Sequence, residues 1–115
     1  MSPRPRETAA RDPRRTAPVF AALGDETRLA LVTKLSGGSR FSIARLTEGS
    51  ALTRQAITKH LRVLQDAGLV RGTRQGRESL FELEPKPLDE ARRALEGIAR
   101  QWDDALARLK SFVEE

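Results

Sequence analysis

Four polar side chains, spaced so that they share one side of a helix, match the hydrogen-bonding edges of DNA bases. They are Gln55, Thr58, Lys59 and Arg62. A glutamine amide can form two hydrogen bonds with adenine, an arginine can form two with guanine, and a threonine can bond a base or contact a thymine methyl group. A lysine suits a phosphate as readily as a base. We interpret these four as candidate base-reading residues, against the simpler alternative of an ordinary solvated helix face.

Three arginines nearby are candidates for binding DNA phosphates. Arg54 lies near the start of the same predicted helix, where unpaired backbone N–H groups also attract phosphate. Arg74 and Arg77 flank Gln75-Gly76, the predicted tip of a basic hairpin that also carries Arg71. Residues 40–77 hold eight basic and two acidic side chains, whereas residues 78–115 hold six basic and ten acidic. This asymmetry favours a polyanionic partner, although charge alone is equally consistent with a generic basic surface.

The helix that would present these side chains has a clear apolar stripe. Leu61 and Leu64 fall within about 40° of Ile57 on a helical wheel, and the four polar residues lie on the other side. Thr53 is a suitable N-cap, and Gly68 is suited to the left-handed position that closes the helix. The sequence therefore predicts an amphipathic helix that buries one face and exposes the other.

The flanking segments complete a winged helix-turn-helix pattern. A short helix capped by Ser42 and ending near Glu48, followed by the turn Gly49-Ser50, precedes the predicted recognition helix. Two short strands, 69–70 and 80–83, follow it and enclose the basic turn. Such a hairpin, or wing, would place its arginines beside the sugar–phosphate backbone.

The remaining segments predict a single domain spanning residues 17–115. Residues 1–16 are rich in arginine and proline and are expected to form a disordered basic arm. A first helix is expected from Pro18, and a second from Glu26, capped by Asp25 and stopped at Gly37-Gly38. A last helix is expected over 88–113. The predicted fold is mainly α with a small β-hairpin, in the order α-α-α-α-β-β-α.

Apolar residues of the first and last helices predict a homodimer. In the last helix they recur at steps of three and four, a nearly heptad seam that needs a partner surface. A dimer with two-fold symmetry that packs first and last helices together would satisfy it. The candidate interface residues are Val19, Phe20, Leu23, Ile98, Trp102, Leu106 and Leu109.

Several residue types needed by other functions are scarce. There is no cysteine, and His60 is the only histidine, so we expect no catalytic residue, no metal site and no cofactor. A partly buried packing role or a phosphate contact is the favoured interpretation of His60. Adjacent Asp103 and Asp104 would diverge by about 100° on a helix and cannot easily share an ion. No signal peptide or membrane span is expected, and we place the protein in the cytoplasm.

The motifs together resemble the ArsR family of bacterial repressors over residues 18–113. The resemblance rests on the phrase at 22–29 (ALGDETRL), the recognition segment at 58–70 (TKHLRVLQDAGLV) and the wing at 75–83 (QGRESLFEL). It implies a homodimeric winged-helix repressor that binds a palindromic operator on double-stranded DNA. The cysteine and histidine ligands of the family's metal sensors are absent, so the resemblance is to a metal-independent subgroup whose effector, if any, is unidentified. The alternative from another class is a winged-helix protein-interaction module that does not read DNA.

Overall fold

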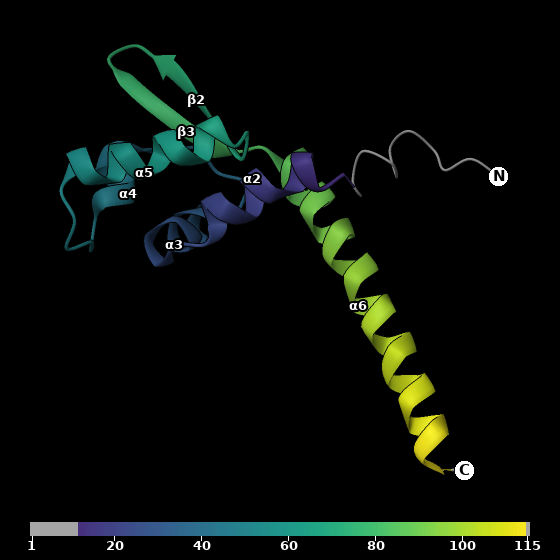
Figure 1. The fold of residues 1–115 in the computed structure, drawn as a ribbon. Helices are drawn as coiled ribbons and strands as arrows, with labels where there is room; N and C mark the ends of the chain where they lie inside the picture. Colours follow the sequence, from purple (N-terminus) through teal and green to yellow (C-terminus); the bar gives the residue numbers. More distant parts are fainter. Residues whose placement is uncertain (1–11, 115) are drawn as a thin grey trace.

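The computed structural model describes residues 12–114, and residues 1–11 of the arm expected over 1–16 lie outside this range. Within the described residues the elements follow the predicted order (Figure 1), with one additional strand, β1, between α3 and α4. The elements are α2 (Pro13–Leu23), α3 (Glu26–Leu35), β1 (Phe41–Ser42), α4 (Ile43–Thr47), α5 (Arg54–Asp66), β2 (Val70–Gln75), β3 (Glu78–Leu83) and α6 (Pro85–Glu114).

The core lies where α3, α4 and α5 meet the sheet. Ile57, Leu61 and Leu64 of α5 are all at most 2% exposed, which confirms the predicted apolar stripe. Leu35 and Leu46 reach the same core from α3 and α4. Because the stripe occupies one side of α5, burying it turns the polar side outward.

The predicted helix boundaries around α5 are confirmed by their capping contacts. The Thr53 hydroxyl accepts a hydrogen bond from the Ala56 N–H at 3.1 Å, and the Ser42 hydroxyl accepts one from Arg45 at 3.2 Å. The carboxylate of Asp25 caps α3 by accepting from the Arg28 N–H. Gly68 has a φ of 78°, the left-handed conformation that ends a helix at low cost only for glycine.

The sheet has three antiparallel strands in the order β1-β3-β2. Phe41 pairs with Phe81, and Val70 pairs with Leu83. Strand β1 was not predicted because two residues are too short to show an alternating pattern. Both hairpin strands are longer than expected, six residues each, so the wing projects well beyond the core.

Helix α2 begins earlier than predicted. Pro13 is its first residue, and the Asp12 carboxylate caps it by accepting a hydrogen bond from the Arg14 N–H at 3.0 Å. Residues 13–16, expected to belong to the disordered arm, are therefore helical, and Pro18 lies inside the helix. Arg15 fixes this first turn to α6 through a 3.0 Å ion pair with Glu90.

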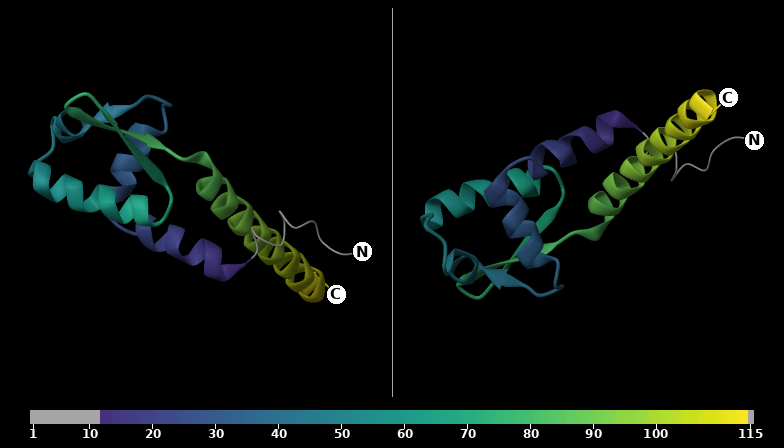
Figure 2. Two further views of the ribbon diagram at one scale, coloured as in Figure 1. Left: turned by 90° about the horizontal axis from the view of Figure 1, so that it is seen from above. Right: turned by 90° about the horizontal axis from the view of Figure 1, so that it is seen from below.

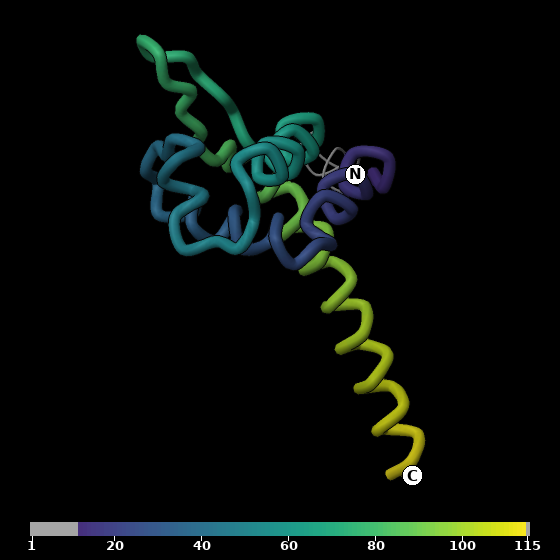
Figure 3. The backbone as a smooth tube through the Cα atoms, turned by 90° about the vertical axis from the view of Figure 1, so that its left-hand side faces the viewer, coloured from purple at the N-terminus to yellow at the C-terminus, as the bar shows by residue number. Residues whose placement is uncertain are grey.

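Helix α6 begins at Pro85, three residues before the predicted start, because proline is well tolerated in the first turn of a helix. It runs for 30 residues, with α2 beside it (Figure 2), but Ala91 is its only buried residue. Its far end and the wing point in opposite directions (Figure 3). This helix gives the chain its long dimension of 66 Å.

Candidate nucleic-acid interface

The outer face of α5 carries the predicted base-reading side chains. Gln55, Lys59 and Arg62 are exposed, and Thr58 is half-buried. The Thr58 hydroxyl donates to the Arg54 carbonyl oxygen at 2.7 Å. Its proton is therefore engaged by the backbone, which leaves its oxygen lone pairs and its methyl group for a base. This differs from the expectation that Thr58 could also donate.

The positive charges on this face are not neutralised by any of the residues that the structure describes. Among residues 12–114, no acidic side chain forms an ion pair with Arg54, Lys59 or Arg62. An unpaired exposed cation keeps its full charge available for a phosphate or a base acceptor. Helix α4 lies against α5, which gives the two-helix arrangement expected from the sequence.

The tip of the wing is a two-residue turn at Gly76-Arg77, between Gln75 and Glu78. Gly76 has a φ of 63°, and no other residue type in the described chain has a positive φ. A positive φ at the first turn position alone is typical of a type II′ hairpin turn, whose twist matches that of the flanking strands. Arg74 and Arg77 are both exposed and lack acidic partners among the described residues, as their predicted phosphate-binding role requires.

Arg71, the third arginine of the hairpin, forms ion pairs with acidic side chains instead. It pairs with Glu82 at 2.7 Å and with Glu84 at 3.2 Å, both on the return path of the chain. The hydrogen bond from Arg71 holds the pKa of the Glu82 carboxyl below its usual range, and Arg40, at 3.6 Å, acts in the same direction. The base of the wing is thus electrically balanced, whereas its tip is not.

A shallow hollow brings two of the predicted phosphate-binding arginines together. Arg54 and Arg77 both line a cavity of about 250 Å³ between the start of α5 and the turn of the wing. Arg74 is not part of its lining. Ser42 and Ser79 add hydroxyl groups to the same hollow, and sequence reasoning missed both because one caps α4 and the other lies in β3.

The wing is held against α5 by a close approach at Gly72. A Cβ atom at this position would lie 2.8 Å from the Gln65 Nε2 atom and 3.1 Å from the Phe81 ring. A larger residue there would have to displace the flexible end of the Gln65 side chain and shift the ring of Phe81 slightly, so glycine is the residue that fits without adjustment. Gly72 was not singled out from the sequence, because the need for a glycine there comes from two distant segments.

The predicted dimer residues divide into two groups. Ile98, Trp102, Leu106 and Leu109 are all between 50% and 65% exposed on α6. Val19, in contrast, is only 3% exposed and belongs to the core of its own chain, so it is withdrawn from the interface. It faces inward because α2 also packs on α3 and α5.

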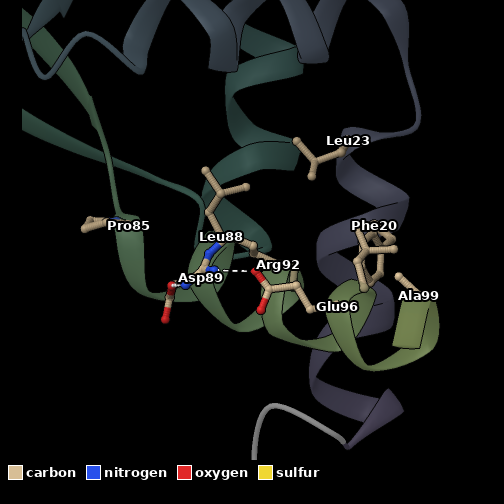
Figure 4. Close-up of a pocket in the computed structure, with 10 residues that line it drawn as sticks. Phe20, Leu23, Pro85, Leu88, Asp89, Arg92, Glu96 and Ala99 are labelled. Carbon is tan, nitrogen blue, oxygen red and sulfur yellow. Dashed lines mark hydrogen bonds and ion pairs between the residues drawn. The ribbon is translucent and has the colours of Figure 1, made fainter. Parts of the chain in front are cut away.

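Phe20 and Leu23 of α2 line an open, largely apolar groove of about 680 Å³ together with residues of α6 (Figure 4). Leu88, Leu95 and Ala99 form the α6 wall of this groove. The groove therefore joins α2 to the first part of the exposed α6 seam.

His60 is partly buried, as predicted, but its partners are polar. Its Nδ1 atom lies 3.4 Å from the Arg28 Nη1 atom and 3.8 Å from the Asp25 Oδ2 atom. Both partners belong to the start of α3 and are more than 30 residues away, so the sequence alone gave no sign of these contacts.

Within residues 12–114, no group of three or more histidine, cysteine or acidic side chains is placed to hold a metal ion. Across the same range, no helix is both long and apolar enough to cross a membrane.

Comparisons with known proteins agree with this geometry. Residues 23–73 match the family model described as a helix-turn-helix domain. The chain is 40% identical over 76 residues to the Bacillus subtilis protein YuzN, an uncharacterized HTH-type transcriptional regulator, with 61% of this chain and 83% of that protein covered. It is 31% identical over 95 residues to the HTH-type transcriptional regulator Rv2034 of Mycobacterium tuberculosis, covering 83% and 85% of the two chains.

Solved structures show the same fold. The crystallised ArsR-like transcriptional regulator from Rhodococcus sp. RHA1 is 40% identical and superposes with a TM-score of 0.72, covering 86% of this chain and 92% of that one. An ArsR family transcriptional regulator, RHA00566, gives the same TM-score at 27% identity, over 80% of this chain and 94% of that one.

Proposed function

Because this chain belongs to the ArsR family of winged helix-turn-helix, DNA-binding transcriptional regulators, we propose that it acts as a homodimeric repressor of a palindromic operator. In this proposal, Gln55, Thr58, Lys59 and Arg62 read bases in the major groove. Arg54, Arg74 and Arg77 hold phosphates beside it. The alternative of an interaction module that does not read DNA is not favoured by the relatives of this chain.

The observation that carries the proposal is the set of unpaired cations spanning α5 and the wing tip. The shared hollow of Arg54 and Arg77 supports one phosphate position between the two elements. Arg71 and Arg92 form ion pairs with acidic side chains, whereas the cations of this set have no acidic partner within residues 12–114. A protein that binds DNA needs such uncompensated charge, because releasing counterions from phosphates supplies much of its affinity.

The dimer rests on the exposed apolar seam of α6. Leu95, Trp102 and Phe112, spread along the helix from its first third to its end, are each more than half exposed. A contiguous apolar surface of this length is unusual on a monomer and is typical of an interface. With two-fold symmetry, the two α5 helices would enter successive major grooves about 34 Å apart.

We further propose that regulation does not depend on a metal and that the protein has no enzymatic activity. The chain has no cysteine, and its single histidine is engaged by Arg28 and Asp25. A regulator that binds chromosomal DNA works in the cytoplasm of a bacterium, and we assign it there. A small-molecule effector is compatible with the groove beside Phe20, but no observation identifies one.

Selection of bound sequences from a random pool of DNA duplexes tests the proposal. We expect a consensus with two-fold symmetry and a steep loss of affinity with salt, because several phosphates are contacted. Absence of binding to any duplex at low salt would rule out the proposed function. A consensus without symmetry would rule out the dimeric mode of binding.

Two substitutions separate base reading from phosphate binding. Gln55→Ala should change the preferred base at one position of each half-site, at a cost of about 1–3 kcal/mol. Arg77→Ala should weaken binding to all DNA sequences about equally. It should also reduce the slope of log affinity against log salt concentration by about one ion. Arg100→Ala on α6 is the matched control, since it removes an exposed arginine far from α5 and the wing. If Gln55→Ala and Arg77→Ala each lowered the affinity for all DNA sequences equally, the assigned roles would be contradicted.

A further inference from the structure

Arg28 joins three helices at one point. Its backbone N–H donates to the Asp25 carboxylate at 3.0 Å, which caps α3. Its side-chain Nε donates to the Ala22 carbonyl oxygen at 2.6 Å, in the last turn of α2. Its Nη1 atom lies 3.4 Å from Nδ1 of His60, in the middle of α5. One residue of α3 thus contacts the cap of its own helix through its backbone, and the end of α2 and the recognition helix through its side chain.

Each contact matches a chemical need of the segment that receives it. The last carbonyl groups of a helix have no partner within the helix, and Arg28 satisfies that of Ala22. A second, longer contact at 3.5 Å reaches the neighbouring Ala21 carbonyl. The guanidinium can serve several acceptors at once because its five N–H groups point in fixed, different directions. A lysine ammonium is a compact point charge and could not contact all of these acceptors at once.

The contact with α5 lies directly behind the base-reading face. His60 follows Lys59 in the chain and points back toward α3, while Lys59 faces outward. An arginine N–H can only donate, so this contact is a hydrogen bond in the tautomer in which Nδ1 of His60 accepts and the ring proton lies on Nε2. Asp25 is the only acidic group near this nitrogen among the described residues, and its 3.8 Å distance is too long for a hydrogen bond.

We propose that Arg28 is a positioning residue that fixes the recognition helix relative to α2 through His60. The inference rests on the proposed DNA-binding function and adds to it. In that function, Phe20 and Leu23 on α2 help form the dimer surface, and the side chains of α5 read bases. Through the Arg28–His60 contact, the packing of α2 in the dimer then determines the distance between the two recognition helices.

The consequence is discrimination between operator spacings. Two half-sites must lie about one helical turn apart for both recognition helices to enter the major groove. A firmly fixed α5 tolerates only one spacing, whereas a loosely held α5 accepts neighbouring spacings as well. Loss of the contact should therefore reduce spacing discrimination more than it reduces the electrostatic attraction to DNA.

The contact itself can be tested without DNA. His60 is the only histidine, so its imidazole nitrogens give an unambiguous ¹⁵N signal in protein without a histidine tag. We expect the wild type to show the tautomer with the proton on Nε2, and Arg28→Met to shift the Nδ1 resonance. Identical imidazole spectra in the two proteins would overturn the contact.

The positioning role is tested on the selected operator and on operators lengthened or shortened by one base pair. The wild type should bind the operator with the selected spacing more tightly than the altered ones. In Arg28→Met the ratio of these affinities should fall about tenfold, equivalent to 1.4 kcal/mol. Binding of Arg28→Met to random duplex at low salt should stay within about twofold of the wild type, because the basic face is intact. Arg28→Lys should behave like Arg28→Met, since one ammonium cannot bridge both helices.

A paired substitution at the other end controls for general destabilisation. His60→Asn keeps an acceptor near the position of Nδ1 and should retain spacing discrimination, whereas His60→Leu should lose it. A purely structural role of Arg28 would lower the melting temperature and all affinities together and leave the ratio between spacings unchanged, which would refute the inference. Failure of the wild type to bind any operator would instead refute the proposed function.

Discussion

Replacing Trp102 with alanine should weaken the proposed dimer strongly and leave the fold of each chain unchanged. Trp102 is 65% exposed, so its side chain makes few contacts that stabilise its own chain. Burying an aromatic side chain removes about 150–250 Å² from water, and roughly 130 Å² of this remains exposed on Trp102. At about 25 cal/mol per Å², coverage of half of that area on both chains contributes about 3 kcal/mol. The dimer Kd should then rise by about 100-fold.

Sedimentation equilibrium over a range of protein concentrations measures this change. The wild type offers a second readout, because Trp102 is the only tryptophan and its fluorescence reports its surroundings. Its emission should shift to shorter wavelength as the protein concentration passes the dimer Kd. Operator affinity of Trp102→Ala should fall at low protein concentration and recover at high concentration.

Arg100→Ala provides the control on the same helix. Residues two positions apart on a helix point about 200° away from each other, so Arg100 lies opposite Trp102. It should leave the dimer Kd within about twofold, because surface substitutions away from an interface cost little. An unchanged Kd in Trp102→Ala would refute the assignment of the α6 seam to the interface. An emission maximum independent of concentration while the protein is dimeric would refute it too.

Two further substitutions test how the wing is held. Gly72→Ala should lower the free energy of unfolding by about 1–3 kcal/mol, because its Cβ would press on the buried ring of Phe81. Thermal unfolding checks this against Thr73→Ala, an exposed neighbour expected to cost less than about 0.5 kcal/mol, and equal effects would disprove the close-packing argument. Glu82→Gln should remove part of the acid sensitivity of the fold. The pKa of Glu82 is lowered by Arg71, so this carboxylate stabilises the fold above its ordinary pKa and loses that contribution as the pH falls. The difference in unfolding free energy between wild type and Glu82→Gln should therefore shrink between about pH 5 and pH 3, and a constant difference would contradict the ion-pair assignment.

Much of the fold was predictable because its signals are local. Thr53, Ser42 and Asp25 cap helices through hydrogen bonds from residues three positions away, and such contacts can be predicted from the sequence. The stripe of α5 follows from helical periodicity alone. The start of α2 differs from the prediction because two prolines can each begin a helix, and Pro13, behind the cap of Asp12, begins this one rather than Pro18.

The candidate site was predictable in its residue types but not in its electrostatics. Arg71, Arg74 and Arg77 look equivalent along the chain, yet only Arg71 is neutralised, by Glu82 across the hairpin. The strand register brings these two together, and periodicity does not report which charges meet across a turn. The meeting of Arg54 with Arg77 in one hollow is likewise a product of the assembled fold.

The sequence by itself determined the helices, their caps, the turn at Gly76 and the side of α5 that faces outward. Each of these follows from interactions within about four residues, or from the burial of one apolar stripe. Only the tertiary structure decided that Val19 lies in the core, that β1 pairs with β3 and that Arg28 reaches His60. These contacts join segments roughly 30 or more residues apart, and their partners are set by how helices and strands pack rather than by any local pattern.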